Sequence, residues 1–170
     1  MDTDKDKVEW TEAEGRALHG RLLANGVKVA VAESLTVGRV QAELGRWSGA
    51  SGFFAGGLTC YALEDKVRLL GVDATHAEAV NAVSARVAEE MAGGVARLFA
   101  CDFGLATTGY AEPDPTRGVA EPFAWVAVAN GDRAWVERVD GVGLDRAAMQ
   151  ARAAAGVLRL LGRVIAGGPA

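Results

Sequence analysis

The chain has 170 residues, the usual length of one domain, and can bury about two-thirds of its unfolded surface. Half of the residues are hydrophobic, which excludes a disordered chain, and the net charge of −4 argues against nucleic-acid binding through phosphates. No apolar run approaches the roughly 20 residues of a membrane helix, and the N-terminus lacks a signal-peptide pattern. We expect a cytoplasmic domain over residues 10–166, with no membrane or nucleic-acid partner, a flexible segment at 1–9 and a frayed end at 167–170.

The first half of the chain alternates between helical and strand periodicity. Apolar spacing before Gly26 is typical of an amphipathic helix, and the hydrophobic run after it is typical of a strand covered on both faces. Gly71 is the predicted end of the short helix at 63–70. The predicted elements are a helix at 11–25, a strand at 27–32, a helix at 37–46, a strand at 53–61 and a helix at 63–70.

The second half ends in a hairpin and a long helix. Ser84 is the predicted cap of a helix, and Asn130-Gly131 is a hairpin signal. The predicted elements are a helix at 85–99, strands at 101–107, 123–129 and 134–139, and a closing helix at 145–166. Strands interleaved with helices predict a single α/β domain with three α/β/α layers and a mixed, mostly parallel sheet.

Three polar residues fall where predicted strands end. Ser34, Tyr61 and Thr108 each fall at the carboxyl end of a predicted strand, and in open α/β sheets ligands bind beyond these ends. Ser34 stands where a strand turns into a helix. There its hydroxyl can cap the helix or act as a nucleophile beside backbone N–H groups.

A serine nucleophile needs a base, and Lys66 is the candidate. His19 lies inside the first predicted helix and His76 in a predicted loop, so neither is well placed. Lys66 follows Tyr61 by five residues, near a helix N-terminus that would lower an amine pKa, and Tyr61 can carry or orient a proton. The residues alone leave open that Ser34 is only a cap and Lys66 only a surface lysine.

The cysteines and histidines show no spacing typical of metal ligands. Cys60 and Cys101 lie in apolar, strand-like segments without a CxxC or Cys/His set. His19 and His76 have no partner at metal spacing. We expect buried free thiols and no metal site.

A series of short segments in one collinear order, over about residues 10–165, resembles a known family. The segments are Ala32-Glu33-Ser34-x-Thr36-x-Gly38, Tyr61-x-x-Glu64-x-Lys66, Leu69-Leu70-Gly71-Val72, Ala82-Val83-Ser84, Glu90-Met91-Ala92, Thr108-Gly109-x-Ala111-x-Pro113 and Asp145-Arg146. They resemble the CinA C-terminal domain family of competence/damage-inducible proteins, which includes nicotinamide mononucleotide (NMN) deamidase.

The resemblance implies a metal-independent amidohydrolase that needs no cofactor. It would act on a small-molecule substrate, hydrolysing the carboxamide of NMN to nicotinic acid mononucleotide and ammonia in pyridine nucleotide salvage. Ser34 would be the nucleophile, Lys66 its base and Tyr61 an assisting residue, with backbone N–H groups at 36–38 as oxyanion donors. The implied substrate-binding residues are Glu33, Thr36, Gly38, Thr108, Gly109 and Arg146.

The chain departs from the family pattern around this site. The family reads Ala-Glu-Ser-Cys-Thr-Gly-Gly, whereas Leu35 and Val37 replace the cysteine and the first glycine here. Glu112 stands in a loop that is glycine-rich in the family, where a phosphate would be expected. The alternative is therefore a catalytically silent binding or assembly module with a remodelled pocket, or an altered substrate without phosphate.

The resemblance also implies self-association, because relatives are commonly dimeric. Trp47 and Phe53-Phe54 flank a glycine-containing loop, and these aromatic residues can belong to a subunit contact or to the ordinary core. We expect a homo-oligomer, with a dimer favoured.

Overall fold

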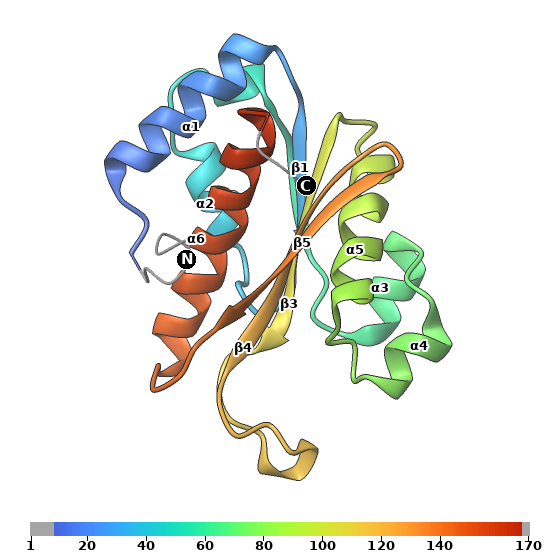
Figure 1. The fold of residues 1–170 in the computed structure, drawn as a ribbon. Coiled ribbons are helices and arrows are strands. Elements are labelled where there is room, and N and C mark those ends of the chain that lie inside the picture. The colour runs from blue at the N-terminus through green and yellow to red at the C-terminus, as the bar shows by residue number, and fades with distance from the viewer. Residues whose placement is uncertain (1–8, 168–170) are drawn as a thin grey trace.

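A computed structural model describes residues 9–167 of the chain (Figure 1). The segments expected to be flexible or frayed, at residues 1–9 and 167–170, lie almost wholly outside the described residues. The described elements are α1 (Glu12–Asn25), β1 (Val29–Glu33), α2 (Arg39–Gly45), β2 (Phe54–Thr59), α3 (Leu63–Leu70), α4 (Ala74–Ala79), α5 (Ala85–Leu98), β3 (Phe103–Tyr110), β4 (Phe123–Asn130), β5 (Arg133–Asp140) and α6 (Arg146–Ile165), with short 3₁₀ turns at Ala50–Gly52 and Pro115–Arg117.

The five strands form one mixed sheet in the order β2-β1-β3-β4-β5. β1 pairs in parallel with β2 and β3, whereas β4 is antiparallel to both β3 and β5. Four strands therefore run in one direction and β4 runs in the other. Figure 1 shows α1, α2 and α6 on one side of the sheet and α3, α4 and α5 on the other, which confirms the predicted three-layer α/β/α fold.

Alternate residues of the central strands feed two separate cores. In β1, Val29 and Val31 pack on the side of α1, α2 and α6, while Ala30 and Ala32 pack on the side of α5. This alternation is the period of two expected of a strand, and both faces of β1 are buried. The small residues on the second face let α5 lie close to the sheet. A Cβ on Gly104 would lie 1.9 Å from the carbonyl oxygen of Ala92 in α5.

The ends of the elements follow capping residues that the sequence displays. Thr11 and Glu14 form a capping box at the start of α1, and Gly26 ends that helix in the left-handed conformation. Ser84 caps α5 as predicted, accepting a hydrogen bond from the Val87 N–H. Gly71 ends α3, at the predicted boundary.

Two differences from the sequence prediction concern the site. A helix, α4, occupies residues expected to be loop, and His76 lies in it; the signal was Asp73, whose carboxylate caps the helix. Strand β3 extends to Tyr110 instead of ending at Thr107, because Thr108, Gly109 and Tyr110 continue to pair with β4. The sequence predicts a loop there because turn-forming residues come directly after this segment.

The thiols and aromatic residues can now be located. Cys60 is a buried free thiol and Cys101 a half-buried one. Phe53 is buried, and the ring of His19 contacts the rings of both Phe53 and Trp47. Phe53 is therefore part of the core of the domain, the second of the two alternatives. The expected dimer stays a prediction. Within the described residues, no helix is long and apolar enough to cross a membrane.

Candidate functional site

A cavity of about 350 Å³ opens beyond the carboxyl ends of β1, β2 and β3, where the sequence placed the ligand site. This volume is near the lower end of the range for small-molecule pockets. Six of the nine residues predicted for the site line it: Ser34, Tyr61, Lys66, Thr108, Gly109 and Arg146. The other three, Glu33, Thr36 and Gly38, are not part of its lining.

Those three residues instead build the turn that carries Ser34. The Glu33 carboxylate is fully buried and accepts hydrogen bonds from the Thr36 hydroxyl (2.5 Å) and the Gly38 N–H (2.9 Å). It also accepts from the N–H groups of Val40 (3.2 Å) and Gln41 (2.8 Å) at the start of α2. A carboxylate at a helix N-terminus is stabilised by these unpaired donors. The structure thus gives Glu33 the capping role that the sequence allowed for Ser34.

The backbone of this turn differs from the prediction at Gly38, and it shows how the turn accommodates Val37. The Gly38 N–H is engaged by Glu33, so it does not serve as the expected oxyanion donor. Val37 is half exposed and has φ +48°. The turn therefore has a left-handed conformation at a position that is occupied by a β-branched residue. Such a residue is strained there, because its side chain clashes with its own backbone.

The Lys66 side chain reaches from α3 to the base of the cavity. It is 2% exposed, and its Nζ lies 3.1 Å from Ser34 Oγ. Nζ also lies 2.8 Å from the Cys60 carbonyl oxygen and 3.0 Å from that of Tyr61. No carboxylate of the described residues forms an ion pair with it. The surface-lysine reading of Lys66 is therefore excluded.

Burial favours the neutral form of this amine relative to a lysine in water. Desolvation lowers the pKa of Lys66 from 10.5, although the nearby Cys60 and Asp65 oppose the shift. Burial also raises the pKa of the Cys60 thiol from 9.0, which favours its uncharged form. The three neighbours of Nζ suit both states of the amine. A neutral amine donates its two hydrogens to the two carbonyls and turns its lone pair to the Ser34 hydroxyl, while an ammonium donates to all three.

Tyr61 occupies the cavity in a different way from the one expected. Its backbone carbonyl holds Lys66, but its hydroxyl accepts a hydrogen bond from Arg146 Nη2 (3.1 Å), and more than half of the residue is exposed. Arg146 Nη1 donates to Glu112 Oε1 at 2.9 Å. The side chain of Tyr61 therefore belongs to a group at the rim of the cavity with Arg146 and Glu112.

Thr108 and Gly109 shape the wall through backbone packing. The buried Thr108 hydroxyl donates to the Ala82 carbonyl (2.7 Å). A Cβ on Gly109 would lie 2.4 Å from the Phe123 carbonyl oxygen, so glycine is required there by the neighbouring strand β4. Strand packing is therefore enough to require glycine at this position.

Part of the opposite wall was not predicted from the sequence. Asn81 and Ala82 both have positive φ and line the cavity, and Asn81 Nδ2 donates to the Tyr110 hydroxyl (3.1 Å). These residues follow α4, a helix that was not predicted. Asn81 is itself a signal for a left-handed turn, since asparagine tolerates positive φ better than most residues.

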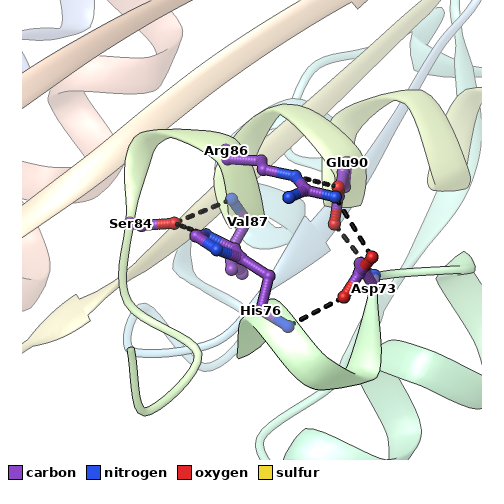
Figure 2. A network of polar contacts seen from close by, with 6 residues as sticks. All are labelled: Asp73, His76, Ser84, Arg86, Val87 and Glu90. Atoms are coloured by element: carbon purple, nitrogen blue, oxygen red, sulfur yellow. Dashed lines mark hydrogen bonds and ion pairs between the residues drawn. The ribbon is translucent and has the colours of Figure 1, made fainter. Parts of the chain in front are cut away.

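A polar network holds this wall in place on α5 (Figure 2). His76 Nε2 lies 2.9 Å from Ser84 Oγ, which accepts from the Val87 N–H as the cap of α5. Arg86 bridges Asp73 at the start of α4 and Glu90 of α5. The network ties α4 to α5, and its serine is a structural cap. Within residues 9–167, no three His, Cys, Asp or Glu side chains are grouped to hold a metal ion.

Comparison with known proteins gives consistent matches over nearly the whole domain. The model of the CinA C-terminal domain family matches residues 12–165. A CinA-like protein of Shewanella baltica is 40% identical over 120 residues, 70% of this chain and 28% of that protein. One of Mycolicibacterium vanbaalenii is 38% identical over 149 residues, 86% of this chain and 35% of that protein. The chain thus spans about a third of the length of these curated relatives.

Solved structures show the same fold. A competence-damaged protein (CinA) superfamily protein from Klebsiella pneumoniae has a TM-score of 0.87 and 27% identity, over 94% of this chain and 99% of that one. A CinA superfamily protein from Enterobacter cloacae has a TM-score of 0.82 and 26% identity, over 89% of this chain and 90% of that one.

Proposed function

This chain belongs to the CinA C-terminal domain family, and from that premise we propose that it is a metal-independent amidohydrolase of the Ser/Lys type. The proposed reaction hydrolyses the carboxamide of NMN, or of a related small amide, to a carboxylate and ammonia. The observation that carries this proposal is the contact of a buried Lys66 amine with the Ser34 hydroxyl, 3.1 Å apart at the base of a cavity. A serine cap would need no buried lysine.

The proposed first step is attack on the amide. Ser34 Oγ bonds to the carbonyl carbon while its proton passes to Lys66 Nζ, whose lone pair is aimed at it by the two carbonyl acceptors. The tetrahedral intermediate then collapses. Its C–N bond breaks, and the Lys66 ammonium protonates the leaving nitrogen, so that ammonia departs and an acyl ester remains on Ser34.

The second half returns the enzyme to its starting state. Water attacks the ester carbon and gives a proton to Lys66, and the C–Oγ bond breaks as Ser34 recovers its proton. The acid is released, so amide and water balance acid and ammonia. The proposed oxyanion donor is the N–H of Leu35, the residue after the nucleophile, which lines the cavity.

Ammonia release from NMN by the purified protein is the direct test. We expect turnover that withstands a chelator, and a loss of at least about 10³-fold in Ser34→Ala, since the covalent route is removed. The matched control is Ser48→Ala, an exposed serine in the loop before the first 3₁₀ turn, which should keep full activity. Turnover that survives in Ser34→Ala would refute the Ser/Lys mechanism.

The binding-module alternative makes a different prediction in the same assay. Strain at Val37 and the carboxylate of Glu112 in the lining are the observations that favour it. If the wild type releases no ammonia from NMN or from a panel of nucleoside and small amides, yet binds one of them, the chain is a silent relative and the amidohydrolase proposal is wrong.

A further inference from the structure

The rim of the cavity contains an internal carboxylate–guanidinium pair. Glu112 Oε1 accepts from Arg146 Nη1 at 2.9 Å, and Tyr61 Oη accepts from Arg146 Nη2 at 3.1 Å. Both terminal nitrogens of Arg146 therefore have a partner on the chain. Arg146 begins α6, Glu112 follows β3 and Tyr61 follows β2, so three separate elements bring this group together.

The charges of the lining have an unequal balance. Four lining residues are lysine, arginine, aspartate or glutamate: Lys66, Arg146, Glu112 and Asp114. With Lys66 neutral, as a general base must be, the lining has one positive and two negative charges, and the Asp114 carboxylate is already paired with Arg117 outside the lining at 3.3 Å. Arg146 is then the cation available to an anionic ligand, and Glu112 already neutralises it.

We propose that Glu112 is a specificity residue which disfavours anionic substrates, so that the site takes an amide without a phosphate, uncharged or cationic. This rests on the proposed amidohydrolase function. A phosphate at the rim would have to displace Glu112 from Arg146 or lie beside its carboxylate, and like charges at short range repel. An amide on a neutral or positively charged ring with an unphosphorylated sugar meets no such opposition.

The size of the effect is limited by solvent. The side chains of Glu112 and Arg146 are 62% and 47% exposed, so their interaction is screened and either can move. We therefore expect a preference of about tenfold, equal to ~1.4 kcal/mol, rather than complete exclusion. The preference should shrink as the salt concentration rises.

The test compares NMN with the riboside of nicotinamide, which has the same amide and ring but no phosphate. The wild type should show a higher kcat/KM for the riboside. Glu112→Gln, which keeps the shape and removes the charge, should move the ratio of the two kcat/KM values about tenfold towards NMN, through KM. Glu78→Gln on α4 is the matched control, because it removes one exposed carboxylate outside the cavity and should leave the ratio unchanged.

Two results would overturn the inference while leaving the amidohydrolase intact. These are a wild type that prefers NMN, and a ratio that does not move in Glu112→Gln. If the wild type hydrolyses neither compound, the proposed function fails, and calorimetric binding of both compounds decides the inference separately. Tighter binding of NMN to Glu112→Gln than to the wild type, with riboside binding unchanged, supports it; equal binding of NMN refutes it.

Discussion

Two basic side chains, Arg159 and Lys66, are buried on opposite sides of the sheet, and they differ in whether a carboxylate pairs with them. Arg159 of α6 is 7% exposed and donates to Glu14 Oε1 at 2.7 Å and to the Glu9 carbonyl at 2.6 Å. Lys66 of α3 is 2% exposed and contacts a hydroxyl and two carbonyls, with no carboxylate among the described residues. The charge of Arg159 is compensated by a carboxylate, whereas burial without a carboxylate lowers the pKa of Lys66.

The comparison separates structure from chemistry. A guanidinium keeps its charge in the protein interior and needs an anion, whereas a buried amine can become neutral. Of the four left-handed residues other than glycine within residues 9–167, Asn81 and Ala82 line the cavity, Val37 lies in the turn beside it, and only Ala100 is elsewhere. Unfavourable conformations and unpaired ionisable groups gather at functional sites more often than elsewhere.

Replacing Lys66 by methionine should separate activity from stability. Lys66→Met removes the base, so activity should fall by about 10³-fold or more, while the free energy of unfolding at pH 7 changes by no more than about 1 kcal/mol. Steady-state kinetics and urea unfolding measure the two. Lys28→Met, an exposed lysine before β1, should leave activity unchanged.

The pH dependence of the same pair has a defined sign. The pKa of Lys66 in the folded protein lies below 10.5. At pH values between this folded pKa and 10.5, the unfolded chain therefore binds more protons than the folded one. Wild-type stability should rise relative to Lys66→Met as the pH increases towards 10.5. A difference that is constant with pH would mean that Lys66 is not depressed.

Replacing Arg159 by methionine should have the reverse pattern. Arg159→Met leaves the Glu14 carboxylate without its buried partner and should cost about 2–3 kcal/mol in urea unfolding, with kcat retained at low temperature. Arg16→Met is the control. Its pair with Glu12 is exposed, so the change should stay within about 0.5 kcal/mol.

Acid titration identifies the Glu14 contribution. Burial alone would raise the pKa of Glu14, but hydrogen bonds from Arg159 and Thr11 lower it from 4.5 to about 2. Its stabilisation is thus present above pH 4.5 and is lost as the pH falls towards 2. Arg159→Met should flatten this acid limb. An unchanged limb would show that the pair does not stabilise the fold.

Replacing Val37 by glycine should relieve the strain at the Ser34 turn. At φ +48° the β-branched side chain costs more than the extra freedom of glycine in the unfolded chain, so Val37→Gly should stabilise by about 0.5–1 kcal/mol. Val142→Gly is the control, because Val142 is exposed without positive φ and should lose stability. If Val37→Gly is less stable than the wild type, the conclusion that Val37 is strained is wrong.

The sequence predicted most of the framework of the site because local signals were present. Ser34 and Lys66 follow strands whose ends lie at the same edge of the sheet, so both could be assigned to one cavity. Helix α4 was missed because it is short, and with it the wall at Asn81. The sequence placed Tyr61 at the site, but it could not show that the backbone carbonyl of Tyr61 contacts Lys66 while its hydroxyl meets Arg146.

Periodicity and capping residues are local, and they were enough for the layers, the carboxyl edge of the sheet and the Ser34 turn, although not for the end of β3 at Tyr110. The direction of a side chain is not local. Tyr61 meets Arg146 across 85 positions of the chain, and Glu112 meets it across 34. Burial of Lys66 without an acid, and the pairing that leaves Arg146 neutralised, were decided only when the sheet brought these elements together, because desolvation and ion pairing depend on neighbours in space.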